Sequence, residues 1–429
     1  MSERAAWLAL PFAVLAFAAG AKAETQPPLQ PYQMVRSLQT LQDRIATGDH
    51  AALPMQNKLL ELIDARLRDA ADEDFAEKRN VRAALVYGMS GGNPSTLAQV
   101  IKRPLLSDED RQLGRGVLAY LSGNTEIAQT TLANFEPKTM APEIGAFLAL
   151  VKGSVNASAN ETTALAYLDS ARLLGPGTLV EEAALRRSLA LEANLGKPDR
   201  FFLASEQYVR RFLRSPYASQ FADSFVTGVL TLHGSLDYAA IDRITSLMDK
   251  DQRKVIYLRL ARRAGIDGLT ELLAFAAQRA EEAVPDGQLD ARSELYSSLS
   301  TLTTGDLDAM KDHLRGIDRD QLSQSDIRLL EAAESVVRSV TATPNLSADG
   351  EAAIASEKQT TLAATPSPAG DQSAQAIKPA APAPEAALPA ASVAKGSTEQ
   401  QPEPDTTDTI ISDARARLSA IDQMLKEAK

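Results

Sequence analysis

Apolar residues recur every three or four positions along most of this chain, and strict alternation is almost absent between about residues 32 and 340. A period near 3.6 places apolar side chains on one face of an α-helix, whereas a half-buried β-strand would alternate them. The first stripe consists of Val35, Leu38, Leu41 and Ile45, and the next of Met55, Leu59, Leu62, Ile63 and Leu67. The pattern predicts an all-α protein whose core is built from these stripes.

Seven glycines follow helical patterns and precede polar turn residues, at intervals of 30 to 43 residues. Glycine commonly ends a helix because it tolerates the left-handed conformation found there. These glycines are Gly92, Gly123, Gly153, Gly196, Gly234, Gly265 and Gly305. Intervals in this range are typical of helix–turn–helix repeats, so we expect each glycine to end a helix.

Two stretches fit the spacing of the second helix in a tetratricopeptide repeat, where small residues let paired helices approach and a proline ends the pair. One stretch carries Ala164, Leu168, Ala171 and Pro176, and the other carries Ala204, Tyr208 and Pro216, with Arg211 in place of the second alanine. The Trp and Leu-Gly signatures of the first helix are missing. Residues 24–340 are therefore predicted to form an irregular α-solenoid of tetratricopeptide-like helix–turn–helix repeats.

The N-terminus has the pattern of a cleavable export signal. Arg4 precedes an apolar run over residues 5–19, and Ala21 and Ala23 provide small residues for cleavage. A membrane anchor is the alternative, but a run of 15 residues is short against the ~20 needed to cross a bilayer. We expect residues 1–23 to be a signal peptide, and the mature protein to lie in a bacterial periplasm without stable membrane insertion.

The C-terminal part changes composition sharply. Residues 341–405 hold nine of the 22 prolines, and no aromatic residue follows Tyr296. Such a segment buries too little apolar surface to offset the entropy of ordering its backbone, so it is predicted to be a disordered linker. Residues 406–429 then show helical spacing again, which predicts a short amphipathic helix. This helix either docks on a partner or folds back onto the core.

Composition excludes several classes of function. Cysteine is absent, which excludes disulfide scaffolds, thiolate metal sites and thiol nucleophiles. The three histidines, His50, His233 and His313, are too scattered to suggest a metal cluster. With 45 basic and 56 acidic residues the formal net charge is −11, which disfavours a nucleic-acid partner. We expect neither cofactor nor metal, and no binding to nucleic acid.

One short motif matches a catalytic pattern. Residues 88–92 read Gly-Met-Ser-Gly-Gly and fit the G-x-S-x-G nucleophile elbow, with Ser90 as the nucleophile of a serine hydrolase. The elbow requires a strand before the serine, whereas the residues before Gly88 continue a helical pattern. The interpretation as a helix end followed by a turn is therefore favoured, and the protein is predicted not to be an enzyme.

Candidate partner-binding residues come from two places. A basic cluster of Arg210, Arg211 and Arg214 on a predicted helix could face a carboxylate-rich partner, although solvation or internal pairing is the default for such clusters. The apolar face of the predicted C-terminal helix is the second candidate. Its residues are Ile411, Leu418, Ile421 and Leu425.

The order of these features resembles one known family. An opening helix that reads PYQMVRSLQTLQDR over residues 31–44 follows the export signal, and degenerate helix pairs and a Pro/Ala-rich tail come after it. The whole is similar to the motility protein MotC family. The resemblance implies a periplasmic accessory of the flagellar motor, without catalytic residues. It would bind the periplasmic part of the stator protein MotB and act as a chaperone for its folding, stability or placement, as flagellar rotation requires. The remaining alternative is a cell-envelope assembly scaffold with another partner.

Overall fold

Helices are the only regular elements in the part of the chain that the structure describes. The computed structural model describes residues 28–283, 290–301 and 307–341, and no strand occurs in these ranges. The predicted all-α class is therefore confirmed there. The predicted signal peptide at 1–23, the linker at 341–405 beyond its first residue, and the helix at 406–429 lie outside the described residues.

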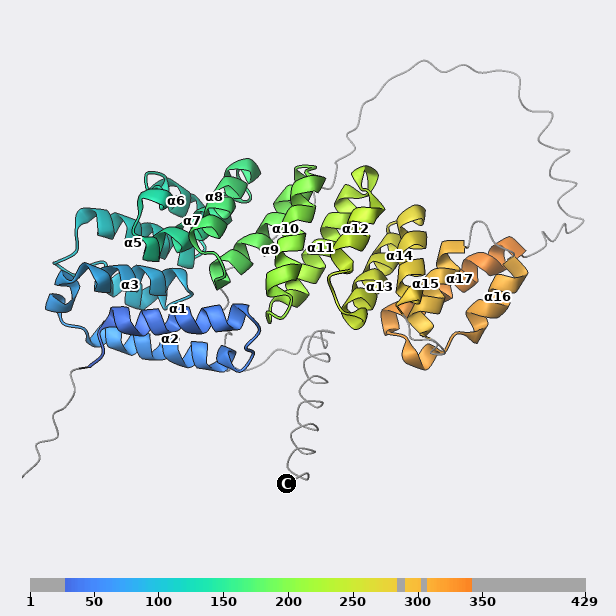
Figure 1. Ribbon diagram of the computed structural model, residues 1–429, viewed down its shortest axis with the longest axis horizontal. Coiled ribbons are helices and arrows are strands. Elements are labelled where there is room, and N and C mark those ends of the chain that lie inside the picture. The colour runs from blue at the N-terminus through green and yellow to red at the C-terminus, as the bar shows by residue number, and fades with distance from the viewer. Residues whose placement is uncertain (1–27, 284–289, 302–306, 342–429) are drawn as a thin grey trace, which may run out of the picture. The chain divides into compact units, whose positions relative to one another are not determined.

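The helices follow one another as a succession of packed neighbours (Figure 1). They are α1 (Pro31–Ala46), α2 (Ala52–Asp69), α3 (Lys78–Met89), α4 (Pro94–Val100), α5 (Asp108–Leu121), α6 (Thr125–Leu132), α7 (Pro142–Asn156), α8 (Glu161–Leu174), α9 (Leu179–Asn194), α10 (Pro198–Phe212), α11 (Ala218–Leu232), α12 (Tyr238–Thr245), α13 (Lys250–Ile266), α14 (Thr270–Glu282), α15 (Ala291–Thr301), α16 (Leu307–Gly316) and α17 (Gln324–Thr341). Short 3-10 turns are η1 (Asp72–Ala76), η2 (Pro137–Thr139), η3 (His233–Ser235) and η4 (Arg319–Gln321).

The odd-numbered helices from α3 to α17 form a continuous row, because each packs against the next odd-numbered helix. Most even-numbered helices pair with them, most extensively in α5–α6, α7–α8 and α13–α14, whereas α12 packs mainly on α10. Local capping sets where several helices begin. Asn160 Oδ1, for instance, accepts the Thr163 N–H in the first turn of α8. A row of first helices with paired second helices is consistent with the predicted solenoid.

Glycine allows close approach between the two helices of a pair. A Cβ atom added to Gly116 on α5 would lie 2.4 Å from the Leu132 side chain on α6. The same addition at Gly153 on α7 would come within 2.7 Å of Leu168 on α8. The prediction that Gly153 ends a helix is therefore wrong, because this glycine lies inside α7 and makes room for its partner helix.

Other glycines end helices as predicted. Gly123 and Gly196 follow α5 and α9 with φ angles of 72° and 61°, which favour glycine. Gly265, by contrast, lies inside α13, and the left-handed residue that follows that helix is Gly268. The sequence pattern marked the end of α13 correctly to within a few residues but assigned the turn to the wrong glycine.

The predicted apolar stripe of α2 is only partly buried. Met55 and Leu62 are 54% and 48% exposed, and the buried face instead runs through Gln56, Leu60 and Ile63. The reason is that α2 packs mainly against α1, α3 and α4. Its apolar residues occupy more than one face, and only the face toward these neighbours is covered.

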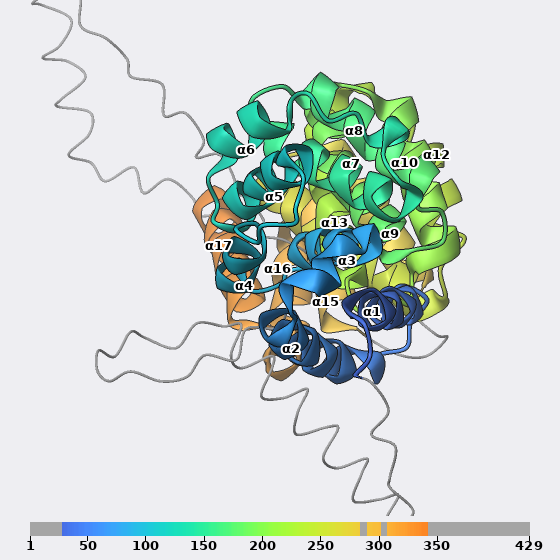
Figure 2. The same ribbon diagram turned by 90° about the vertical axis from the view of Figure 1, so that its left-hand side faces the viewer.

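The first helix returns to the middle of the row. α1 packs against α2, α3 and also α9, as Figure 2 shows. Next to this contact, the Nε2 atom of His50 lies 3.0 Å from the carbonyl oxygen of Arg214, which joins the α1–α2 turn to the α10–α11 turn. A regular solenoid has contacts only between neighbouring repeats. This long-range closure was not predicted from the sequence.

Buried tyrosines pair with carboxylates four times along the chain, and an arginine reaches each carboxylate. The groups are Tyr87–Asp64–Arg68, Tyr208–Glu182–Arg186, Tyr257–Asp242–Arg279 and Tyr296–Asp326–Arg262. Burial raises the pKa of each of these tyrosine hydroxyls, so each stays protonated and donates to its carboxylate. The three-residue groups join helices that are adjacent in space.

Candidate partner-binding groove

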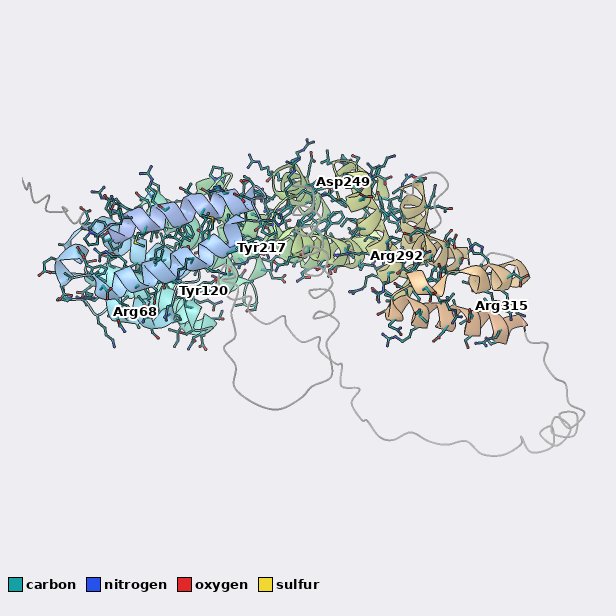
Figure 3. All side chains as sticks on the ribbon, turned by 90° about the horizontal axis from the view of Figure 1, so that it is seen from below. Arg68, Tyr120, Tyr217, Asp249, Arg292 and Arg315 are labelled. Atoms are coloured by element: carbon teal, nitrogen blue, oxygen red, sulfur yellow. The ribbon has the colours of Figure 1, made fainter. Side chains whose placement is uncertain are left out.

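A groove of about 1010 Å³ crosses four odd-numbered helices, from the end of α5 to the start of α11. We call it the α5–α11 groove. Tyr120, at the α5 end, is labelled in Figure 3. Gln220 and Ser224 line the opposite end on α11. A concave site along the first helices of stacked pairs is the usual binding surface of a helical repeat protein.

The walls of this groove are largely apolar. Leu121 from α5, Val155 from α7 and Leu191 from α9 contribute side chains to it. The turn between α7 and α8 reads Ala157-Ser-Ala159, and these small side chains leave the space open. The groove therefore combines apolar walls with room for another molecule, as ligand sites in proteins commonly do.

Polar side chains along the groove are held in place by neighbours. Arg187 Nη1 donates a hydrogen bond to Ser154 Oγ on α7. The side-chain Nδ2 of Asn194 on α9 donates a hydrogen bond to Glu161 Oε1 at 2.9 Å. These contacts connect successive helices and fix the direction of the polar groups before any ligand arrives, which lowers the entropic cost of binding.

Under the groove lies a buried ionic cluster. Arg186 lines the groove yet is only 3% exposed, because its Nε donates to Glu182 Oε1 at 3.3 Å and its guanidinium lies over the Tyr217 ring. Tyr208 Oη donates to the same oxygen of Glu182 at 2.8 Å. Burial raises the pKa of the Glu182 carboxyl, while Arg186 lowers it. The cluster makes this part of the groove rigid.

A second buried carboxylate belongs to Glu192, one residue after Leu191 of the groove wall. Its side chain is fully buried, and Oε1 lies 3.5 Å from Arg200 Nε. Arg200 also donates to Asp169 Oδ2 at 2.7 Å, so its charge is shared between two carboxylates. Burial raises the pKa of Glu192 to about 7, and the charge of Arg200 opposes this rise only in part. This carboxylate titrates close to neutral pH.

The predicted basic cluster is largely engaged within the protein. Arg210 forms an ion pair with Glu206 on its own helix, and Arg211 Nη1 contacts both carboxylate oxygens of the buried Glu181 at 2.6 and 2.7 Å. Arg214 is exposed. The internal pairing that the sequence left open thus holds for two of the three arginines. The other candidate residues, Ile411, Leu418, Ile421 and Leu425, lie outside the described residues, and a partner-binding role for either set stays a prediction.

The hydrolase motif does not have the geometry of a nucleophile elbow. Ser90 is the C-terminal cap of α3, no strand precedes it, and its Oγ is buried without a hydrogen-bond partner among the described residues. Nδ1 of His233 lies 2.8 Å from the Leu230 carbonyl oxygen at the C-terminal end of α11. Ser90 therefore lies where a substrate cannot reach it, at a helix end rather than at a strand-to-helix turn.

No group of three or more metal-ligating side chains gathers in the described ranges. No helix in the same ranges is long and apolar enough to cross a membrane.

Sequence reasoning did not find the groove. Its residues come from helix ends and turns that are far apart in the chain, such as Tyr120 and Gln220. Two features of the sequence could have indicated the groove. They are the run of small residues at 157–159 and the consecutive arginines Arg186 and Arg187. Only the packing of α5, α7, α9 and α11 shows that these residues share one surface.

A family model and a known protein with the same description both match this chain. The family model described as "Chemotaxis protein MotC" matches residues 1–429. A protein of Rhizobium meliloti (strain 1021) with the same description is 38% identical over 326 residues, which cover 76% of this chain and 75% of the relative. No solved structure matches the chain.

Proposed function

Because this chain belongs to the MotC family of chemotaxis and motility proteins, we propose that it supports flagellar rotation by binding the periplasmic part of the stator protein MotB. The resemblance that the opening helix and the helix pairs indicated is thus confirmed at the level of the family. The observation that carries the proposal is the α5–α11 groove, a surface with apolar walls and fixed polar groups that crosses four helices.

Such a groove acts by binding and needs no chemical step. A segment of the stator protein that enters it buries apolar side chains against Leu121, Val155 and Leu191. A protein that binds one conformation of its partner stabilises that conformation by mass action. This is how the protein would support the folding, stability or placement of the stator in the periplasm.

The direct test is binding between the purified mature chain and the purified periplasmic domain of the stator protein, measured by isothermal titration calorimetry. We expect a dissociation constant in the range of roughly 1–50 μM. A strain that lacks the protein should assemble flagella that do not rotate. No detectable binding, together with normal swimming of the deletion strain, would contradict the proposal. A strain without flagella would favour an envelope-assembly scaffold with another partner.

A further inference from the structure

A second pocket, of about 290 Å³, lies where α1 meets the starts of α7 and α9 and the end of α8. We call it the α1–α9 pocket. It shares no residue with the α5–α11 groove, and its volume is close to the lower end of the range for small-molecule sites. Because α1 returns here to the middle of the row, residues that are far apart in the chain line one pocket.

The side of α1 that lines the pocket is polar. Four of its residues share this side because they are spaced i, i+3, i+4 and i+7. They are Arg36, Gln39, Thr40 and Asp43. The buried apolar residues of α1 lie on the other side of the helix. An amphipathic helix normally turns its polar side to solvent, whereas here the neighbouring helices cover part of it and leave a pocket.

Gln42 lies at the edge of this polar side and lines the pocket, although the residue is only 2% exposed. Its Nε2 is buried and has no hydrogen-bond partner among the described residues. Buried amide groups are nearly always hydrogen-bonded, because an unmet donor has lost the hydrogen bonds that it made to water. The unmet donor therefore indicates a partner from outside the chain. One ordered water needs far less space than this pocket has, so a larger ligand fits.

Asp43 supplies a second oriented polar group. Burial raises the pKa of its carboxyl, and a hydrogen bond from the backbone N–H of Leu179, the first residue of α9, opposes this rise. The contact joins α1 to the start of α9 and fixes the direction of the carboxyl. Gln39, one turn before Asp43, adds a half-buried amide. The pocket thus offers two amides, which both donate and accept, and one carboxylate acceptor.

α7 and α8 contribute an apolar wall. Ala146 and Phe147 come from the first half of α7, and Leu174 is the last residue of α8. A ligand that fits both walls has an apolar face and an edge of groups that donate and accept hydrogen bonds. A sugar ring has this form, because C–H bonds lie on its faces and hydroxyls, each a donor and an acceptor, surround its edge.

The ionisable side chains of the pocket favour a neutral ligand. Arg36 is basic, whereas Asp43 and Glu143 are acidic. Glu143 also lies 3.9 Å from Arg82, which is outside the pocket. Because both signs are present, a charged ligand of either sign meets a like charge. A hydroxyl, in contrast, donates to a carboxylate and accepts from an amide without bringing a charge into the pocket.

We propose that the α1–α9 pocket binds one neutral sugar ring. Gln42 and Asp43 hydrogen-bond to neighbouring hydroxyls, and the Phe147 side of the pocket packs against the apolar face of the ring. Because only the folded protein holds this pocket, the sugar stabilises the contact between the first helix and the middle of the row. The inference does not rest on the proposed function, since the pocket and the α5–α11 groove are separate.

The test uses the mature full-length chain with glucose, galactose and N-acetylglucosamine as probes, and with the neutral peptide N-acetyl-trialanine amide for comparison. Binding is measured by saturation-transfer NMR and by the shift of the unfolding midpoint with probe concentration. We expect at least one sugar to bind saturably with a dissociation constant on the order of 1 mM, and the peptide not to bind. If no sugar shows saturable binding up to about 50 mM, the proposal is wrong.

Gln42→Leu locates the site. Leucine lacks the amide at a similar size, so this variant should bind the sugar at least ten-fold more weakly. Without sugar, its unfolding midpoint should equal or exceed that of the wild type, because a buried unmet amide has been removed. A lower midpoint with unchanged sugar affinity would show a purely structural glutamine and would overturn the proposal. Gln112→Leu, at an exposed position of α5, is the matched control and should keep the wild-type affinity.

Leu174→Trp covers the case in which Gln42→Leu does not fold. Leu174 is an exposed residue that lines the pocket, so tryptophan should fill the space and abolish sugar binding while the cooperative unfolding transition is kept. Wild-type affinity in this variant would place the sugar elsewhere on the protein and contradict the proposal. Binding of the peptide alone, lost in Gln42→Leu, would show that the pocket takes a peptide segment and that the assignment to a sugar is wrong.

Discussion

The Tyr208 hydroxyl on α10 donates a 2.8 Å hydrogen bond to the carboxylate of Glu182 on α9, and both side chains are fully buried. The contact lies beneath the α5–α11 groove, where Glu182 also anchors Arg186. An isolated carboxylate in this place would be strongly destabilising. The tyrosine hydroxyl and the guanidinium together make its burial tolerable. The same combination at three other places indicates a recurring way of joining neighbouring helices.

Tyr208→Phe should therefore destabilise the protein by about 1–3 kcal/mol, because it leaves a buried carboxylate with one donor fewer. The free energy of unfolding from urea titration measures this. Tyr120→Phe is the matched control, since Tyr120 is only partly buried, and it should change stability by less than about 0.5 kcal/mol. Equal effects of the two substitutions would show that the Tyr208 hydrogen bond contributes nothing.

Glu192 should make stability fall as the pH rises through neutrality. Its pKa is about 7 in the folded protein against an ordinary value of 4.5, so the folded state holds its proton more tightly than the unfolded state. The contribution of this group is fully present below pH 4.5 and is lost as the pH rises through 7. Glu192→Gln removes the titration, and its unfolding free energy relative to wild type should rise by up to about 3 kcal/mol between pH 4.5 and 8.

Urea unfolding at a series of pH values checks the Glu192 prediction. The exposed Glu126→Gln controls for the loss of one carboxylate from the surface. The other charged groups that act on Glu192 are Arg200, Arg172 and Asp169, and all three remain in the variant. A difference from wild type that stays constant across the pH range would refute the raised pKa.

Arg211→Ala should reduce stability, because among the described residues it leaves the buried carboxylate of Glu181 with only the Gly177 N–H as a donor. Arg211 is itself about half exposed, so we expect a moderate loss of about 1–2 kcal/mol. Arg210→Ala, whose ion pair with Glu206 is largely on the surface, should cost less than about 0.5 kcal/mol. Thermal denaturation of both variants checks this, and the reverse ranking would contradict it.

Two glycine-to-alanine substitutions should have opposite signs. Alanine normally stabilises a helix interior by about 1 kcal/mol relative to glycine. At Gly265 the added Cβ would have its nearest neighbour, Leu273, at 3.8 Å, so Gly265→Ala should stabilise. At Gly153 the Cβ would lie 2.7 Å from Leu168, so Gly153→Ala should separate α7 from α8 and destabilise by roughly 1–3 kcal/mol. Unfolding midpoints that shift in the same direction would disprove the close packing at Gly153.

The local pattern of the sequence was a good guide where one helix has one buried face. Val35, Leu38, Leu41 and Ile45 were predicted to lie on the buried side of the first helix, and all four are buried. The same reasoning was wrong for Met55 and Leu62 on α2, which have helical spacing but are about half exposed. Periodicity reports which side chains share a face, and it does not report what packs on that face.

By itself the sequence determined the helical class, the approximate helix boundaries and the family, because these depend on local spacing, capping residues and overall similarity. Only the tertiary structure decided that α1 returns to α9, that Arg211 pairs with Glu181, and that residues from α5 to α11 share one groove. Each of these features joins residues that are far apart in the chain. A helical pattern repeats every 3.6 residues and carries no information about which distant helix will lie against it.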